Sequence, residues 1–582
     1  MIYEVSFTED KEIDIKIILS YENIIECKLV FRKGGRPYIS FGAMLDLKIS
    51  GILHRQLSKS ENILSCGCGY QELVLVNSKY NNSVIYPEFV YFSDDVDTVK
   101  GLSISIPGLY EYFNGPNSFE FTDGYLRKEI KNSFLELNFN IGNDRYRLNV
   151  EHHAKTEGNS IENKVVIIQD AVVNVTKVDG FIQLEFAREI SKIITGLFSL
   201  LLGFKLSINK IWLFDSECHT GLPFYFLSDS EKEMPFDHWI NTFTKFNTLN
   251  VQDWEIIIER AFSDEYQSDF EKFWVRIIQL YSYKGFWEYE TLGVFSTLEA
   301  YFSYIVAQPN IKDDFKVYLE SIQDDKNSTL SKIISLQEKF NNKKTLTKME
   351  AHIFKTVKLI VGTSKPRATH GQKYDYVMAN FIPKEVSSIL SISTDDIDTI
   401  KLVRVAAAHA LPLDGSVRDL YQKIKVIRSK FMMLLHYLAF KGLGITDEKF
   451  AEILVHNNYL RKKEANLNEF HINVLLRYEY IYKVEENELI DISLLKGDNL
   501  IFVYDSGTKI VNYIDEQFNV LMTKWRALNE SEMLVTSRDL ESFIYENYIC
   551  VSEFLVNVVS YVYFHSDDEN IRINNAIIIT LK

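Results

Sequence analysis

The chain contains 582 residues, with 64 Lys and Arg against 80 Asp and Glu, which gives a formal net charge of −16. A chain of this length exceeds what one hydrophobic core supports, so we expect about three domains. The negative balance excludes a surface that is basic throughout, and any nucleic-acid site would need a local basic patch. The longest apolar run, residues 193–204, is interrupted at Thr195 and Gly196. It is much shorter than the roughly 18 residues of a membrane span, so it predicts a buried helix.

The cysteines and the N-terminus predict a reducing, cytoplasmic environment. Five Cys in a chain of this size do not indicate a disulfide framework. The close pair Cys66 and Cys68 lacks the second pair of ligands that a structural zinc site needs, so no metal is predicted. No glycine-rich phosphate loop of either common spacing is present, so no cofactor is predicted. The first residues lack the basic and apolar segments of a secretory signal.

Residues 1–205 have the pattern of short β-strands. Residues 13–17 alternate apolar and polar side chains, as in a strand with one buried face. Residues 134–141 and 145–150 flank a Gly-Asn-Asp sequence, which predicts a hairpin with a short turn. Further strands are expected at 24–31, 44–49, 73–76, 165–168 and 181–186, and a helix that packs on a sheet is expected at 189–204. The N-terminal domain is therefore predicted to be an antiparallel sandwich or barrel.

Helical periodicity begins near residue 253, after a connecting region expected at 206–250. Apolar residues recur three or four positions apart at 254–261, 270–281 and 292–306, which predicts the core-facing sides of three helices. Glu299 interrupts the third stripe, and burial of a carboxylate costs several kcal/mol unless a cation pairs with it. We expect Arg404 to be that cation. The alternative places Glu299 at the edge of the stripe, in water. A further helix is expected at 348–361.

The stretch around Arg404 combines two side chains that can act together on a phosphodiester without a metal. Arg404 lies in an apolar run, His409 follows five residues later, and a long amphipathic segment occupies 417–443. The planar guanidinium of Arg fits phosphate oxygens, and His transfers protons near neutral pH. Residues 398–445 hold eight Lys and Arg against three Asp and Glu, so the local charge opposes the global one. An Arg and a His near a helix end can also simply cap carbonyls.

This stretch, its downstream helix and the closing Lys441-Gly-Leu-Gly-Ile445 resemble the C-terminal end of a HEPN domain. The resemblance is strongest to the ApeA-type HEPN proteins of bacterial anti-phage defence. In that family an Arg is followed by a polar residue, two to four variable residues and a His, and the next helix ends near Leu-Gly-Ile. Arg404 and His409 match this pattern, whereas Val405 replaces the polar residue. The resemblance covers about residues 1–445 and is by layout alone in the β-rich part.

The resemblance implies a metal-independent endoribonuclease, a toxin of abortive infection that cuts RNA with an Arg-x4-His site. His409 would move a proton at the ribose 2′-OH or the leaving 5′-oxygen, Arg404 would hold the phosphate, and Glu299 would support the site. Residues five apart on an ideal helix lie ~140° apart around its axis. Either His409 therefore lies past the helix end, or two copies share the site. The resemblance implies the second arrangement, a homodimer, with RNA (tRNA or another structured RNA) and a phage-derived trigger as further partners.

A second Arg–His pair, Arg367 and His370, lies in Arg-Ala-Thr-His-Gly, which also resembles HEPN sites. Its spacing is short for the family, so Arg404 and His409 are preferred as the catalytic pair. Both pairs could line one groove. The expected RNA-binding cations are Lys401, Arg418, Lys365 and Arg367. Two other functions stay open: a catalytically inactive HEPN-type sensor in phage defence, because of Val405, and a plain interaction scaffold.

Residues 446–582 lie beyond the resemblance. Thr446 precedes an acidic turn and is expected to cap a helix, and later pieces such as 501–504 and 571–581 mix strand and helix. The predicted fold is thus α+β and multidomain. It has a β-rich domain at 1–205, the connecting region 206–250, an all-α HEPN bundle at 251–445 and a mixed α/β extension of unknown role at 446–582.

Overall fold

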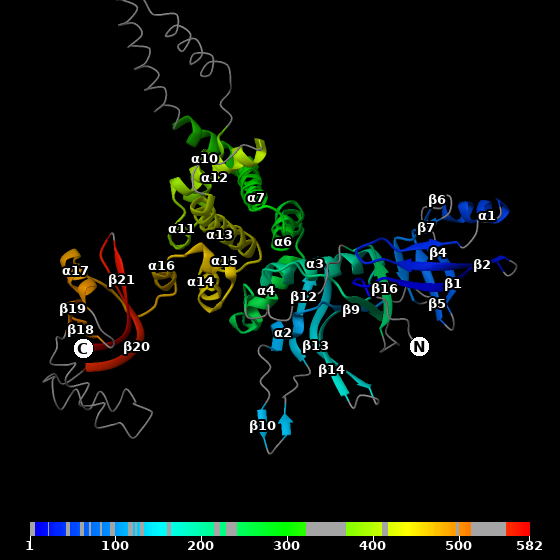
Figure 1. Cartoon of the computed structure of the whole chain (residues 1–582), viewed down its shortest axis with the longest axis horizontal. Coiled ribbons are helices and arrows are strands. Elements are labelled where there is room, and N and C mark those ends of the chain that lie inside the picture. Colours follow the sequence, from blue (N-terminus) through cyan, green and yellow to red (C-terminus); the bar gives the residue numbers. More distant parts are fainter. Residues whose placement is uncertain are drawn as a thin grey trace, which may run out of the picture. The chain divides into compact units, whose positions relative to one another are not determined.

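The computed structural model places the described residues in two compact units (Figure 1). The first unit contains residues 1–383 and 392–467, and the second contains residues 384–391 and 468–582. The structure describes residues 6–20, 23–41, 47–58, 63–68, 71–81, 84–92, 99–114, 120–122, 125–127, 133–159, 164–214, 221–228, 241–321, 368–409, 417–495, 500–513, 554–567 and 569–581. The expected helix at 348–361 lies outside these residues. None of the helices in the described part has the length and apolarity needed to cross a membrane.

The N-terminal part of the first unit is one large antiparallel sheet. Its strands, with the separate hairpin β10–β11, are β1 (Lys11–Ser20), β2 (Asn23–Phe31), β3 (Tyr38–Ser40), β4 (Ile63–Cys68), β5 (Gln71–Val76), β6 (Lys79–Asn81), β7 (Val84–Tyr86), β8 (Phe89–Tyr91), β9 (Gly101–Ser105), β10 (Glu120–Thr122), β11 (Tyr125–Arg127), β12 (Ser133–Ile141), β13 (Asp144–Asn159), β14 (Lys164–Lys177), β15 (Lys210–Phe214) and β16 (Leu222–Phe226). In the described part of the chain, fourteen strands pair in the order β12-β13-β14-β9-β15-β16-β8-β5-β4-β1-β2-β3-β7-β6. The α+β class and the antiparallel N-terminal sheet expected from the sequence are confirmed.

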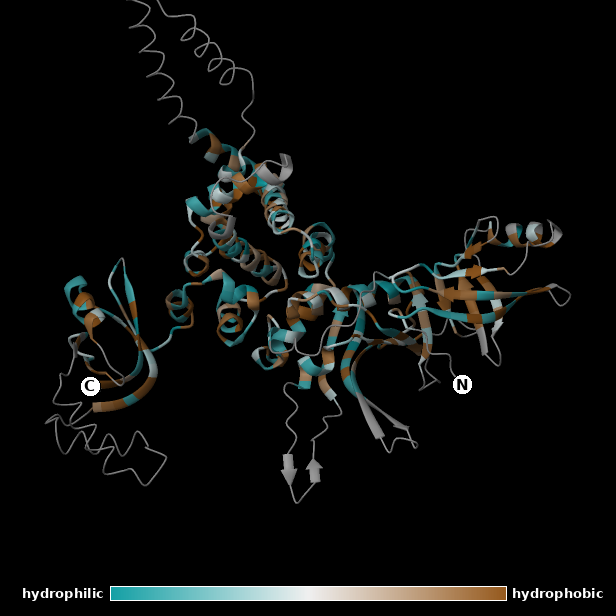
Figure 2. Cartoon of the chain, viewed as in Figure 1, coloured by the Kyte–Doolittle hydropathy of each residue, from teal (hydrophilic) through white to brown (hydrophobic). Residues whose placement is uncertain are grey.

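The hairpin of β12 and β13 follows the predicted pattern. Residues along β12 alternate between exposed and buried, and hydrophilic and hydrophobic residues alternate along such strands in Figure 2. Ile141 pairs with Asp144, so the turn contains two residues and is one residue shorter than expected. Gly142 begins this turn with φ 59°, a conformation that glycine adopts without steric cost.

Two segments predicted to be strands are helical, and one expected linker belongs to the sheet. Residues 44–49 were expected to form a strand, but α1 (Leu47–Leu57) begins within them. Residues 181–186 were also expected to be a strand, but α3 (Leu184–Leu202) begins there. The deciding pattern is the helical spacing of the buried residues Leu184, Ala187, Ile190 and Ile194. The segment expected to connect domains, 206–250, contributes β15 and β16, whose apolar residues complete the middle of the sheet.

Helices form the remainder of the first unit. They are α2 (Leu109–Asn114), the 3₁₀ turn η2 (Phe246–Thr248), α4 (Val251–Ala261), α5 (Asp264–Asp269), the π-helical turn η3 (Phe270–Trp274), α6 (Val275–Tyr281), α7 (Trp287–Ala307), α10 (His370–Phe381), α12 (Thr394–His409), α13 (Val417–Gly442), α14 (Asp447–His456) and α15 (Leu460–Ala465). The three predicted apolar stripes lie on α4, on the α5–η3–α6 segment and on α7, with Trp254, Trp274 and Phe302 buried. Helix α7 packs against α10, α12 and α13.

The second unit combines a mixed sheet with three short helices. Its strand order is β17 (Ile481–Lys483), β20 (Phe554–His565), β21 (Asn570–Leu581), β18 (Ile501–Asp505) and β19 (Ile510–Tyr513). Its helices are α11 (Lys384–Leu390), α16 (Glu469–Leu475) and α17 (Glu486–Leu494). The core includes Leu489, Phe502, Val562, Phe564 and Ile578.

The division between the units differs from the boundary expected at residue 445. Thr446 accepts from the amide of Lys449 as the predicted N-cap of α14. However, α14 and α15 belong to the first unit, because Lys449 donates to the carbonyl of Thr248 and Tyr459 donates to the carbonyl of Gly203.

Replacing Gly196 with Ala should destabilise the first unit, because a Cβ at this position would clash with the ring of Phe270. Overpacking typically costs ~1–3 kcal/mol, while Ala gains about 1 kcal/mol over Gly in a helix. We expect a net loss of up to about 2 kcal/mol, measured by urea unfolding. Gly67→Ala is the control, since a Cβ there would meet no atom within 4 Å. Equal stability of the two variants would show that α3 and η3 do not pack this closely.

Candidate active site

Arg404 and Glu299 form an ion pair between α12 and α7. Nη1 of Arg404 lies 3.0 Å from Oε2 of Glu299, and the two side chains are 43% and 26% exposed. The guanidinium also lies 5.9 Å from the ring centroid of Phe295, which is one helical turn before Glu299 on α7. The pairing predicted for the carboxylate within the apolar stripe is therefore present.

His370 joins this pair from α10. Its ring packs edge-on against Phe295, with 4.3 Å between the centroids. Neither ring nitrogen has a hydrogen-bond partner among the residues that the structure describes. Burial lowers the pKa of His370 to about 4, and the positive charges of Arg404, Lys401 and Lys373 act in the same direction. The imidazole is therefore neutral at pH 7 and lies within electrostatic range of Arg404.

Local contacts at the start of α10 fix this arrangement. Thr369 caps the helix and forms a reciprocal capping box with Gln372, which makes His370 the first helical residue. One turn later, Nζ of Lys373 donates to Oγ of Ser303 at 2.9 Å. Ser303 in turn donates to the backbone carbonyl of Glu299. Helix α10 is thus tied to α7 at the position of the ion pair.

The structure gives the positions of some, but not all, of the other predicted site residues. His409 is the last residue of α12, so helical geometry separates it from Arg404 by ~140° around the axis. The helix positions of His409 and Arg418 are described, but their side chains are not. Lys365 and Arg367 lie outside the described residues altogether. Of the four predicted RNA-binding cations, Lys401 is the one whose side chain the structure describes.

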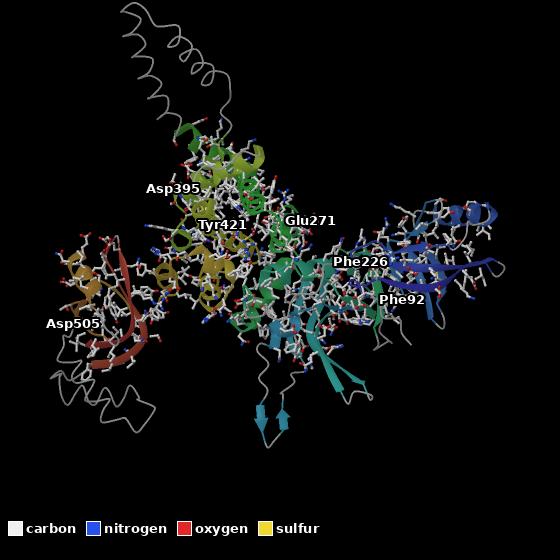
Figure 3. The ribbon with its side chains drawn as sticks, in the orientation of Figure 1. Phe92, Phe226, Glu271, Asp395, Tyr421 and Asp505 are labelled. Atoms are coloured by element: carbon white, nitrogen blue, oxygen red, sulfur yellow. The ribbon has the colours of Figure 1, made fainter. Side chains whose placement is uncertain are left out.

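The basic character of residues 398–445 is largely compensated in the folded chain. Lys401 pairs with Asp398 at 2.8 Å. Lys423 pairs with Asp395 at 2.7 Å, and Lys430 pairs with Asp396 at 3.3 Å. Asp395 on α12 and Tyr421 on α13 are labelled in Figure 3. The two aspartates lie just before the segment in which the charges were counted, so the sequence overstated the local positive charge.

A buried charge network on α7, α13 and α15 was not predicted. Glu290 accepts from Arg428 and from Arg461, each at 2.5 Å, and all three side chains are at most 16% exposed. Nearby, the buried His436 contacts the hydroxyl of Tyr281 through Nε2 at 3.0 Å. An Arg and a His within the apolar stripe of α13 were a signal for such a network, but their partners lie more than 20 residues away in sequence.

Acidification should destabilise the first unit through His370 and His436. Burial lowers the pKa of His436 to about 3 and that of His370 to about 4, both below the ~6.5 of an unfolded chain. The unfolded state therefore binds more protons, and stability falls as the pH drops below ~6.5. At pH 5 the loss is about 2 kcal/mol for His436 and less for the part-exposed His370.

Urea unfolding at pH 7 and pH 5 measures this loss. His436→Gln and His370→Gln should each show a smaller difference between the two pH values than the unaltered chain. Parallel pH dependence in all three proteins would contradict the burial of these imidazoles.

Comparison of the chain with models of protein families, with curated proteins and with solved structures gives no match. Within the part of the chain that the structure describes, no three His, Cys, Asp or Glu side chains gather as metal ligands would.

Proposed function

We propose that the protein is an ApeA-like HEPN endoribonuclease that cuts RNA without a metal in anti-phage abortive infection. The observation that carries the proposal is the convergence of Arg404, Glu299 and His370 where α7, α10 and α12 meet. A permanent cation and a carboxylate that orients it can hold a phosphodiester, and the uncharged imidazole of His370 beside them is the alternative to His409 as the proton carrier. In this proposal, the helices between residues 251 and 445 form the HEPN domain, and the protein acts in the cytoplasm.

The reaction would be attack of a ribose 2′-oxygen on the adjacent phosphorus. A neutral imidazole accepts the 2′-OH proton, the bond from phosphorus to the 5′-oxygen breaks, and the imidazolium so formed donates that proton to the leaving 5′-oxygen. The products are a 2′,3′-cyclic phosphate and a 5′-OH. Nη1 of Arg404 faces Glu299, and the remaining guanidinium donors are available to phosphate oxygens. DNA lacks the 2′-OH and would not react.

A second copy of the chain would complete the site. The ~140° separation of Arg404 and His409 on α12 prevents both from facing one phosphate within a single copy. Two copies that meet at α12 would place Arg404 of one copy opposite His409 of the other. Leu402 and Val405 flank Arg404 and are 69% and 50% exposed, and such exposed apolar residues provide a surface that a second copy would cover.

His409→Ala should abolish cleavage while leaving the fold intact, because His409 is proposed to transfer the proton. Purified protein is incubated with total cellular RNA in the presence of EDTA, and cleaved ends are tested for 2′,3′-cyclic phosphate. His153→Ala is the control, since His153 is an exposed imidazole on β13. If His409→Ala still cleaves and His370→Ala does not, the proton carrier is His370. If the unaltered chain leaves RNA intact, the protein does not cut RNA without a trigger, and the inactive sensor and the interaction scaffold stay as the alternatives.

A further inference from the structure

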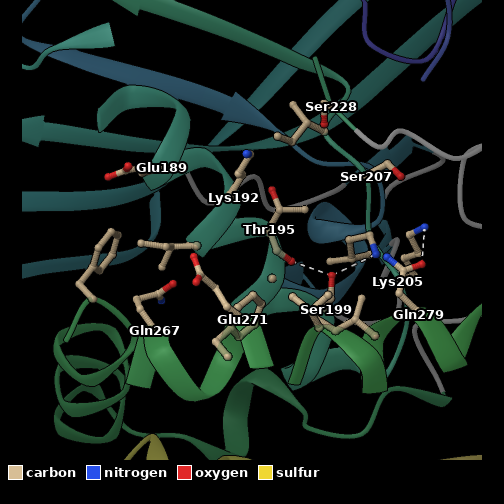
Figure 4. Close-up of a pocket in the computed structure, with 18 of the residues that line it drawn as sticks. Glu189, Lys192, Thr195, Ser199, Lys205, Ser207, Ser228, Gln267, Glu271 and Gln279 are labelled. Carbon is tan, nitrogen blue, oxygen red and sulfur yellow. Dashed lines mark hydrogen bonds between the residues drawn. The ribbon is translucent and has the colours of Figure 1, made fainter. Parts of the chain in front are cut away.

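A cavity of about 620 Å³ lies between α3 and the α5–η3–α6 segment of the first unit (Figure 4). This volume is within the ~300–1,000 Å³ of small-molecule sites. The cavity shares no residue with the candidate active site, so an inference from it does not depend on the proposed ribonuclease function.

The walls of the cavity are largely apolar. They include Phe186, Ile193, Phe262, Phe270 and Ile278. Phe270 and Glu271 belong to the π-helical turn η3, and π-helical turns occur frequently at functional sites because they widen the helix locally. The absence of a side chain at Gly196 lets the ring of Phe270 approach α3 closely. The lining is thus suited to an aliphatic or aromatic group.

The hydroxyl and amide groups of the lining are mostly satisfied within the protein. Thr195 donates to the carbonyl of Ser191, and Ser199 donates to that of Thr195, each at 2.7 Å. Nζ of Lys205 donates to the side-chain oxygen of Gln279 at 3.2 Å, as the dashed line in Figure 4 shows.

Two charged side chains of opposite sign have no close partner in the described part of the chain. Lys192 and Glu271 both line the cavity and are labelled in Figure 4. Among the described residues, neither forms an ion pair or a hydrogen bond. Burial lowers the pKa of Lys192, and the charge of Arg188 adds to this, while Glu189 and Glu271 act in the opposite direction. Both residues are nevertheless exposed overall, so the two charges keep contact with water and a ligand would reach them from solvent.

The charges of the lining residues also restrict the charge that a bound ligand can carry. Glu189, Asp264 and Glu271 are three carboxylates against the two ammonium groups of Lys192 and Lys205. A polyanion such as a nucleoside triphosphate would be repelled by this balance, whereas one carboxylate at Lys192 and one ammonium at Glu271 would complement it.

We propose that this cavity binds a small zwitterion with an apolar body, of the chemical class of a short peptide with aromatic or aliphatic side chains. Its carboxylate would pair with Lys192 and its ammonium with Glu271. Its side chains would lie against Phe270 and Ile278, in the apolar part of the cavity.

Calorimetric titration of the full chain with the dipeptide Phe-Leu tests the proposal. N-acetyl-Phe-Leu removes the positive charge, and Phe-Leu amide removes the negative charge, with the same side chains. A charge-assisted contact contributes enough that each blocked peptide should bind at least about tenfold more weakly than Phe-Leu. Equal affinity of all three peptides, or no binding of Phe-Leu at millimolar concentration, would overturn the proposal.

Substitutions of Lys192 and Glu271 show which of the two residues binds the carboxylate of the peptide and which binds its ammonium group. Lys192→Met should weaken Phe-Leu binding about tenfold and leave the amide unaffected, while Glu271→Gln should weaken Phe-Leu and leave the acetylated peptide unaffected. Lys272→Met is the matched control, because the Lys272 ammonium donates to Ser268 and lies 5.0 Å from the ring centroid of Tyr304. Melting temperatures of all variants are compared. Loss of binding in the control, or retained affinity in both charge variants at unchanged melting temperature, would contradict the assignment.

Discussion

Arg404→Lys is expected to slow RNA cleavage by roughly 10² or more, equivalent to ~2.7 kcal/mol of transition-state stabilisation. Lys keeps the charge but loses the planar fork that donates two parallel hydrogen bonds to a phosphate. RNA binding should weaken much less, because non-specific attraction comes from many cations together. Single-turnover cleavage and melting temperature are measured on the same preparation.

The control for this substitution is Arg147→Lys. Among the residues that the structure describes, the Arg147 side chain pairs with the exposed Glu136 alone, at 3.9 Å, so cleavage and stability should both be unchanged. The Arg404–Glu299 pair is itself part-exposed, and pairs of this kind contribute ~0.2–1 kcal/mol. An unchanged rate per folded molecule together with a lowered melting temperature would remove Arg404 from catalysis and leave it as the ion-pair partner of Glu299.

Glu290→Ala is expected to destabilise the first unit by about 3–5 kcal/mol, because removing one member of a buried charge network leaves the others uncompensated. Arg428 and Arg461 both point at Glu290, and they are 7% and 16% exposed. The measurement is the urea midpoint of the transition that includes α13, with hydrogen exchange of the α13 amides as the local readout.

Glu26→Ala is the matched control for the loss of a carboxylate. Glu26 pairs with Lys16 at 3.0 Å, but both side chains are more than 60% exposed, so the expected loss is below about 1 kcal/mol. A loss of similar size for Glu290→Ala would mean that water reaches the two guanidinium groups.

The need of Glu299 for a cation could be predicted because it depends on local periodicity. An apolar stripe identifies the buried face of α7, and a carboxylate on that face requires a cation. The apolar stripes of α4, η3 and α6 were predicted for the same reason. In each case, residues within two helical turns contain the information.

Features that depend on distant segments could not be predicted in this way. His370 and Arg404 are 34 positions apart, and only the packing of α10 and α12 on α7 brings them together. Strands β15 and β16 were interpreted as a linker, because their place in the sheet depends on pairing with β9 and β8. Compensation of Lys423 by Asp395 likewise depends on contact between different helices.

The discontinuity of the second unit has a consequence for synthesis on the ribosome. Helix α11 leaves the ribosome between two segments of the first unit, but its partner α16 begins 79 positions after the last residue of α11, at Glu469. Until then Val386, Ile389 and Leu390, all fully buried in the finished protein, have no partner helix, and the amide of Asn468 cannot yet donate to the carbonyl of Ile389. Since domains generally fold as units during translation, the nascent chain carries an exposed apolar helix while its first unit folds. The second unit can therefore complete its packing only after α16 has been synthesised.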